Sequence, residues 1–147
     1  MRKAFTIVEL LVVMALIALM AGSGAAISLS AGRKKAVENA AEDLASAMRQ
    51  ARDYVQAGKK DANCAAPLDG WQVVVDSSGY TVQGKCGGSY FGNPKKIFSN
   101  GVTTTYSGTV LFRPLSLGTN LGSDLTITLS ASGTTPKTVK VTKNGEV

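Results

Sequence analysis

The feature that most constrains this sequence is an apolar run near its start that contains a single acid. Residues 5–21 read Phe-Thr-Ile-Val-Glu-Leu-Leu-Val-Val-Met-Ala-Leu-Ile-Ala-Leu-Met-Ala, and Glu9 is the only charged residue among them. Small and apolar residues continue to about Ala31, and about 20 such residues cross a bilayer as a helix. We therefore predict a transmembrane helix over 5–31. A carboxylate in hydrocarbon costs about 3 kcal/mol and needs a partner, which makes Glu9 the first candidate functional residue.

Residues 1–13 carry a family resemblance. They read Met-Arg-Lys-Ala-Phe-Thr-Ile-Val-Glu-Leu-Leu-Val-Val, which resembles the leader and N-terminus of type IV prepilins and type II secretion pseudopilins. The resemblance implies that a prepilin peptidase removes the leader 1–4 between Ala4 and Phe5 and methylates Phe5. It also implies that Glu9 guides assembly by meeting the Phe5 amine of a neighbouring subunit. The family almost always has Gly at the place of Ala4. Ala is the next smallest residue, so this is the mildest change, and whether it slows cleavage stays open.

Two other interpretations of this segment are an ordinary secretory signal peptide and a plain single-pass anchor. Residues 21–25, Ala-Gly-Ser-Gly-Ala, imitate the small-residue cut site that follows a signal-peptide core. Glu9 would lie inside that core without benefit, which favours the prepilin interpretation. Gly22, Ser23 and Gly24 mark either a flexible stretch or a close helix–helix contact, and both interpretations stay open.

An amphipathic helix is predicted from Arg33 to about residue 57. Lys34 with Glu38 and Arg49 with Asp53 are opposite charges four residues apart and are expected to pair. Gly58 is expected to end the helix. Apolar residues recur at helical spacing at Val37, Ala40, Ala41, Leu44, Ala47, Met48, Ala51, Tyr54 and Val55.

The remainder of the chain predicts strands. Segments 71–76 and 80–83 flank a short loop, Ser77-Ser78-Gly79, and further strands are expected at 109–113, 124–129 and 138–142. Alternating apolar and polar residues indicate a half-buried antiparallel sheet, and the amphipathic helix is the candidate to cover it. The predicted fold class is α+β: a long N-terminal helix, half transmembrane and half amphipathic, packed on a C-terminal antiparallel sheet. This order is similar to pilins generally, with 32–147 as the extracytoplasmic globular domain.

Two cysteines, Cys64 and Cys86, lie in the region predicted outside the cytoplasm. An even pair in an oxidising compartment predicts one disulfide. A metal site is the alternative, although the sequence has no His and no CxxC motif. Residues 64–67, 70–71, 86 and 139–145 together look like the minor pseudopilin group of type II secretion protein H and the fimbrial protein FimT.

Catalytic chemistry is not indicated by the residue types present. Without His or suggestively paired acids, the usual general base is missing. Asp69 and Asp76 flank Trp71 and are interpreted as turn and strand-end acids. We predict no enzyme activity, no metal and no cofactor.

Nucleic-acid binding is the second class of function to weigh, because the chain has a net charge of +6. Within residues 64–147 the surplus is three cations, which is thin for phosphate binding, and aromatic residues for base stacking are few. The cations of this region are Lys85, Lys95, Lys96, Arg113, Lys137, Lys140 and Lys143. A DNA-binding minor pilin of an uptake pilus is therefore an alternative, as is a membrane-anchored secreted β domain.

The predicted function is that of a minor pilin or pseudopilin, a structural subunit of a type IV pilus or a type II secretion pseudopilus. The resemblance implies a single-pass protein of the inner or cytoplasmic membrane with its C-terminal domain outside. It implies as partners other pilin subunits in a helical filament, the prepilin peptidase, the membrane assembly platform and, before assembly, the lipid bilayer. Secretion, pilus and DNA-uptake machines share this N-terminus, and the choice among them stays open.

Overall fold

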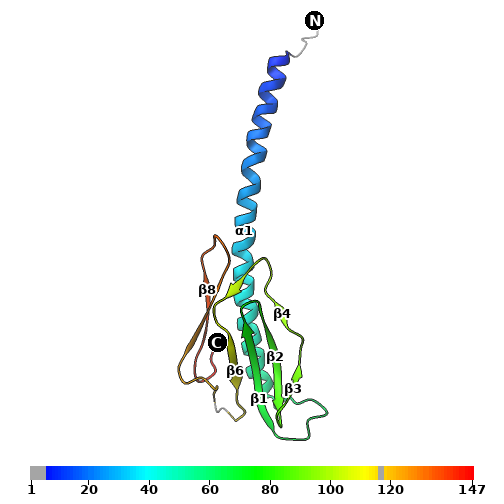
Figure 1. Ribbon diagram of the computed structural model, residues 1–147, viewed down its shortest axis with the longest axis vertical. Helices are drawn as coiled ribbons and strands as arrows, with labels where there is room; N and C mark the ends of the chain where they lie inside the picture. The colour runs from blue at the N-terminus through cyan, green and yellow to red at the C-terminus, as the bar shows by residue number, and fades with distance from the viewer. Residues whose placement is uncertain (1–5, 116–117) are drawn as a thin grey trace. The chain divides into compact units, whose positions relative to one another are not determined.

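The structure is a computed structural model that describes residues 6–115 and 118–147, with the side chains of residues 21–29 outside the description. The chain divides into two compact units, Met1–Gly32 and Arg33–Val147. Helix α1, Ile7–Gln56, contributes residues to both units, and the described strands all belong to the second (Figure 1). The strands are β1 Leu68–Asp76, β2 Gly79–Cys86, β3 Ser89–Gly92, β4 Lys96–Ile97, β5 Thr103–Thr104, β6 Gly108–Phe112, β7 Leu125–Ser130 and β8 Lys137–Val141.

Helix α1 ends where the sequence predicts. Gly58 has a φ of 62°, the left-handed conformation that glycine adopts without a side-chain penalty. Its N–H donates to the Val55 carbonyl at 3.0 Å, and the Lys59 N–H donates to the Tyr54 carbonyl at 2.9 Å. These two hydrogen bonds form the Schellman motif, which satisfies the last carbonyls of the helix and turns the chain toward β1.

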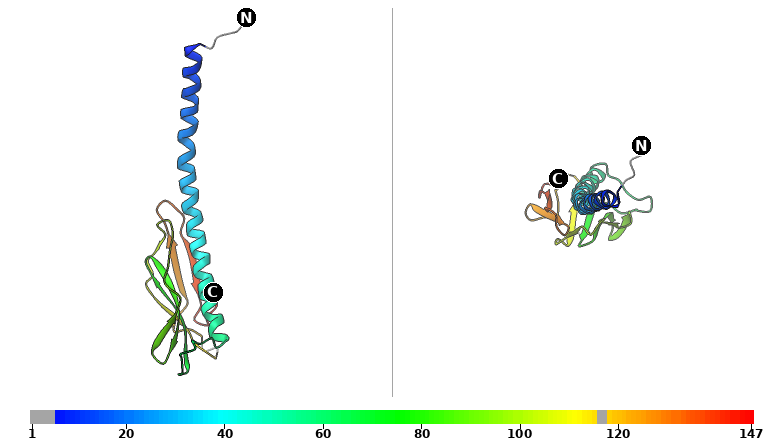
Figure 2. Two further views of the ribbon diagram at one scale, coloured as in Figure 1. Left: turned by 90° about the vertical axis from the view of Figure 1, so that its right-hand side faces the viewer. Right: turned by 90° about the horizontal axis from the view of Figure 1, so that it is seen from above.

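Within the described residues of the second unit, the strands form two antiparallel sheets. One has the order β3-β2-β1-β6, with β4 also pairing β2, and the other has the order β5-β7-β8. The strands lie in an arc along one side of the second-unit part of α1 (Figure 2). Helix and antiparallel sheets together confirm the α+β class.

The hydrophobic core of the second unit lies between α1 and the inner faces of both sheets. Leu44 and Met48 on the helix are fully buried, as are Val73 on β1 and Ile127 on β7. Buried and more exposed residues alternate along β7 and toward the end of β8 as predicted, because every second side chain points to the helix. Among the residues whose burial is described, those of the core all fall between Ala36 and Val141, so this unit contains its own core. The helical residues of that core are Ala36, Val37, Ala40, Leu44, Ala47, Met48, Ala51 and Val55.

The β1–β2 hairpin is tighter than predicted. Gly79 was expected in the loop, but it pairs with Asp76 and belongs to β2. Because Gly79 has no side chain, β4 can approach β2 closely; a Cβ at this position would collide with the Lys96 carbonyl of β4. Ser78 N–H donates to Asp76 Oδ1 at 2.9 Å and closes the two-residue turn.

The two ion pairs predicted within the helix, Lys34 with Glu38 and Arg49 with Asp53, are wrong, because both acids have other partners. Glu38 Oε1 lies 3.3 Å from Lys137 Nζ of β8, and the Asp53 carboxylate lies 3.7 Å from Arg52 Nε. A sheet packed on the helix supplies a cation that local spacing does not reveal, so Glu38 is drawn to β8 in place of Lys34.

Candidate functional site

The start of α1 is organised around Thr6 and Glu9. Thr6 precedes the first helical residue, and its Oγ1 accepts the Glu9 N–H at 3.3 Å, while its carbonyl accepts the Leu10 N–H at 3.2 Å. Thr6 is therefore the N-cap, and Glu9 lies three residues on, in the spacing of a capping box. Glu9 therefore lies in the first turn of α1, where the positive end of the helix dipole favours an anion.

Glu9 was predicted from the sequence as a functional residue, whereas the capping role of Thr6 was not. The signal was present, because Thr-Ile-Val-Glu before an apolar run is the sequence form of a capping box.

Around Glu9 the side chains are apolar and exposed. Ile7 is 80% exposed and Val8 69%. Exposure continues on every side of the helix through Leu10, Leu11, Val12, Val13, Met14, Leu16, Ile17, Leu19 and Met20. A contiguous apolar surface of this kind marks a site that another apolar surface covers.

The transmembrane span predicted over 5–31 is not found in the described part of the chain. Among those residues, no helix combines the length and the apolar character that a membrane crossing requires. Such a span needs about 20 apolar residues in a row, and both Phe5 and the side chains of 21–29 lie outside the description. The predicted cleavage and methylation site, Ala4 and Phe5, also lies outside the described residues.

Cys64 and Cys86 form the disulfide that the sequence predicts, with their Cα atoms 6.1 Å apart. The bridge fastens the segment between α1 and β1 to the last residue of β2. Nearby, Trp71 Nε1 donates to the Lys59 carbonyl at 2.8 Å and packs edge-on against the Tyr54 ring at 4.7 Å. The end of the helix is therefore fixed to the sheet both covalently and through Trp71.

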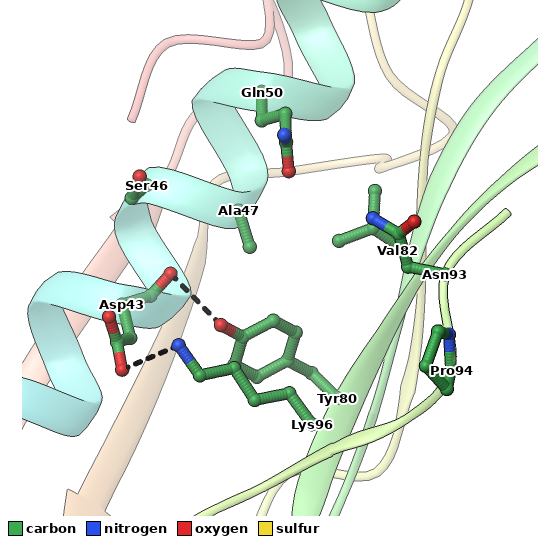
Figure 3. A pocket seen from close by; sticks show the side chains of 9 residues that line it. All are labelled: Asp43, Ser46, Ala47, Gln50, Tyr80, Val82, Asn93, Pro94 and Lys96. Atoms are coloured by element: carbon green, nitrogen blue, oxygen red, sulfur yellow. Dashed lines mark hydrogen bonds and ion pairs between the residues drawn. The ribbon is translucent and has the colours of Figure 1, made fainter.

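A pocket of about 290 Å³ lies between the second-unit part of α1 and the β2–β4 edge, lined by the residues labelled in Figure 3. Lys96 Nζ lies 2.9 Å from Asp43 Oδ2, and the Tyr80 hydroxyl donates to the Asp43 carbonyl at 3.4 Å. The bond to Asp43 raises the pKa of Lys96, and burial raises the pKa of Tyr80. Both shifts favour the charged lysine and the neutral phenol at neutral pH. The arrangement joins the sheet edge to the helix.

Four of the lysines weighed for phosphate binding are paired with acids. Lys95 lies 2.7 Å from Asp76, and its bond holds the pKa of that carboxyl at about 2. Lys140 lies 3.5 Å from Asp124, and Lys96 and Lys137 have the acidic partners given above. Four of the cations weighed for nucleic-acid binding are therefore neutralised locally, which weakens that alternative.

Comparison with known proteins bears on the N-terminus. Residues 1–25 match the family model of the prokaryotic N-terminal methylation motif. The match supports a type IV pilin-like or pseudopilin precursor, a structural class whose members are processed by prepilin peptidase and assemble with other pilin subunits. No curated protein and no solved structure matches the chain.

Proposed function

We propose that this protein is a minor pilin or pseudopilin, a structural subunit anchored in a membrane before it enters a helical filament. Prepilin peptidase cuts between Ala4 and Phe5 and methylates the Phe5 amine. The N-terminal part of α1 then packs among the same segments of neighbouring subunits. The narrower placement, with type II secretion protein H and FimT, is supported by the Cys64 and Cys86 pair and by Gly70-Trp71.

The observation that carries this proposal is Glu9, a single acid in the first turn of α1 within an exposed apolar surface. Ile7, Val8 and Leu10 beside Glu9 can be covered by lipid or by other helices, and the two environments are similarly apolar. Exchange of one for the other is therefore almost neutral in free energy. The specific contribution to assembly must come from a polar contact, and Glu9 is the acid available to make it.

The Phe5 amine is a suitable partner for Glu9, and one from a neighbouring subunit is favoured. Cleavage before Phe5 would create a cation next to the N-cap, where the helix dipole disfavours positive charge. A carboxylate from another subunit offsets this unfavourable interaction. A charge-assisted hydrogen bond of this kind contributes about 1.5–3 kcal/mol.

The test compares Glu9→Leu and Glu9→Asp with the wild type. Intact-mass analysis should show loss of residues 1–4 and one added methyl group in all three proteins. In sheared filaments we expect Glu9→Leu to be depleted by about tenfold or more, as loss of a charge-assisted bond implies. Glu9→Asp should fall between, because the charge is kept and its reach is shortened.

Glu42→Leu is the matched control, since Glu42 is an exposed acid on the second-unit part of the same helix. It should enter filaments at the wild-type level. Recovery of Glu9→Leu at that level would contradict the pairing. Retention of residue 1 in cells with active peptidase, or a cut near residue 24, would contradict the proposal as a whole.

A further inference from the structure

The second unit begins with three consecutive cations, Arg33, Lys34 and Lys35, and all three are exposed. Arg33 Nη1 donates to the Ser132 carbonyl at 3.5 Å, which leaves its charge uncompensated. Within the described residues, neither Lys34 nor Lys35 has an acid at ion-pair distance. They differ in this from Lys95, which directly precedes β4, and from the strand lysines Lys96, Lys137 and Lys140, each of which has an acidic partner.

The acid nearest to these cations along the helix is already paired with another lysine. Glu38, four residues after Lys34, is engaged by Lys137 at 3.3 Å. The β7–β8 turn that Arg33 contacts reads Ala-Ser-Gly-Thr-Thr-Pro over 131–136 and contains no acid. In Figure 1 this turn extends beside the second-unit part of α1. Residues 33–35 therefore form an exposed cationic patch without an acidic partner among the described residues.

We propose that residues 33–35 bind the anionic headgroups of phospholipids in the membrane that holds the subunit before assembly. The inference rests on the proposed function for the presence of that membrane. The patch directly follows the apolar run that ends near Ala31, so these are the first charges after the segment that lipid or other helices cover. Lys and Arg suit this place because their apolar stems lie along hydrocarbon while their charges reach the headgroups. Each cation near an anionic surface strengthens binding by about fivefold.

The experiment measures lipid preference on the full chain. The protein is purified in a mild non-ionic detergent containing equal amounts of phosphatidylglycerol and phosphatidylcholine with identical acyl chains. Native mass spectrometry then gives the ratio of the two lipids retained. We expect the wild type to prefer phosphatidylglycerol. Lys34→Gln/Lys35→Gln should reduce that preference by about tenfold or more, given about fivefold for each cation.

Two double variants serve as controls. Lys59→Gln/Lys60→Gln removes the same dipeptide just beyond the other end of α1 and should keep the preference. Lys34→Arg/Lys35→Arg keeps the charge and should also keep it. Circular dichroism verifies that all variants retain the wild-type helix content.

Three results would overturn the proposal: equal retention of the two lipids by the wild type, retention of neither lipid, or equal losses in the two glutamine variants. Glu9→Leu separates this inference from the proposed function. That variant tests assembly and keeps the cationic patch, so it should retain the wild-type lipid preference even where it fails to enter filaments.

Discussion

Removal of the Cys64–Cys86 bridge should destabilise the second unit by an amount that the structure sets. The two cysteines are 22 positions apart, and a closed loop of that length stabilises the folded state by about 3 kcal/mol in the chain-entropy estimate. With a urea m-value of about 1–2 kcal/mol/M for a unit of this size, Cys64→Ala/Cys86→Ala should lower the unfolding midpoint by about 2 M. The fluorescence of Trp71 reports the transition, because it is the only tryptophan and is 4% exposed.

The wild type under reducing conditions is the matched control for this variant. Reduction opens the bridge but keeps both sulfur atoms, so it removes the loop constraint without creating a cavity at the buried Cys86. We expect reduction to account for most of the shift, with the small remainder due to lost packing. A reduced protein whose midpoint moves by less than about 0.5 M would refute the loop-constraint argument, since a shift that small corresponds to less than about 1 kcal/mol.

Three further predictions concern single positions. Ala4→Gly should speed removal of residues 1–4, measured as the fraction of mature protein in a pulse-chase, and unchanged kinetics would show that the residue before the cut is not limiting. Gly58→Ala should lower the free energy of unfolding in urea by about 1 kcal/mol, because the φ of Gly58 is 62°, which is left-handed, while no atom lies within 4 Å of the added Cβ. Gly58→Asn should lower it less, and equal losses in the two variants would contradict a conformational cause. Asp76→Asn should lose less than about 1 kcal/mol because the pair with Lys95 is exposed. Since the folded pKa of Asp76 is lowered from 3.8 to about 2, its contribution is present above pH 4 and disappears as pH falls through 2, so wild type and variant should unfold alike at that pH.

The predictable parts of the fold are those that local sequence determines. Gly58 ends α1 as expected because a helix C-terminus is decided by a few adjacent residues. The alternation of buried and more exposed residues along β7 was predicted for the same reason. The short strands β3, β4 and β5 were not predicted, because a strand of two to four residues is defined by its partner. Strand β4, for example, exists through Gly79 pairing with Ile97.

The ion-pair partners could not be predicted from the sequence, because they are set by residues far apart along the chain. Spacing along the helix predicts Lys34 for Glu38, but the fold brings Lys137 from almost a hundred residues away. The same fold leaves Lys34 and Lys35 unneutralised, so the cationic patch becomes visible only once the partners of the other lysines are known. The N-cap role of Thr6, in contrast, could have been predicted from the spacing of Thr6 and Glu9.

The two parts of α1 satisfy their apolar residues in different ways, and this difference bears on how assembly is controlled. From Ala36 to Val55 the apolar residues form one stripe that the sheets of the same chain bury, so this part needs no partner. From Ile7 to Met20 the apolar side chains are exposed on every side, so this part must be covered by lipid or by other subunits. Because those two covers are similar in apolar character, the free-energy difference between them is small. A few polar groups can then decide between the two states. In the two proposals above, Glu9 favours a neighbouring subunit and the cations 33–35 favour anionic lipid.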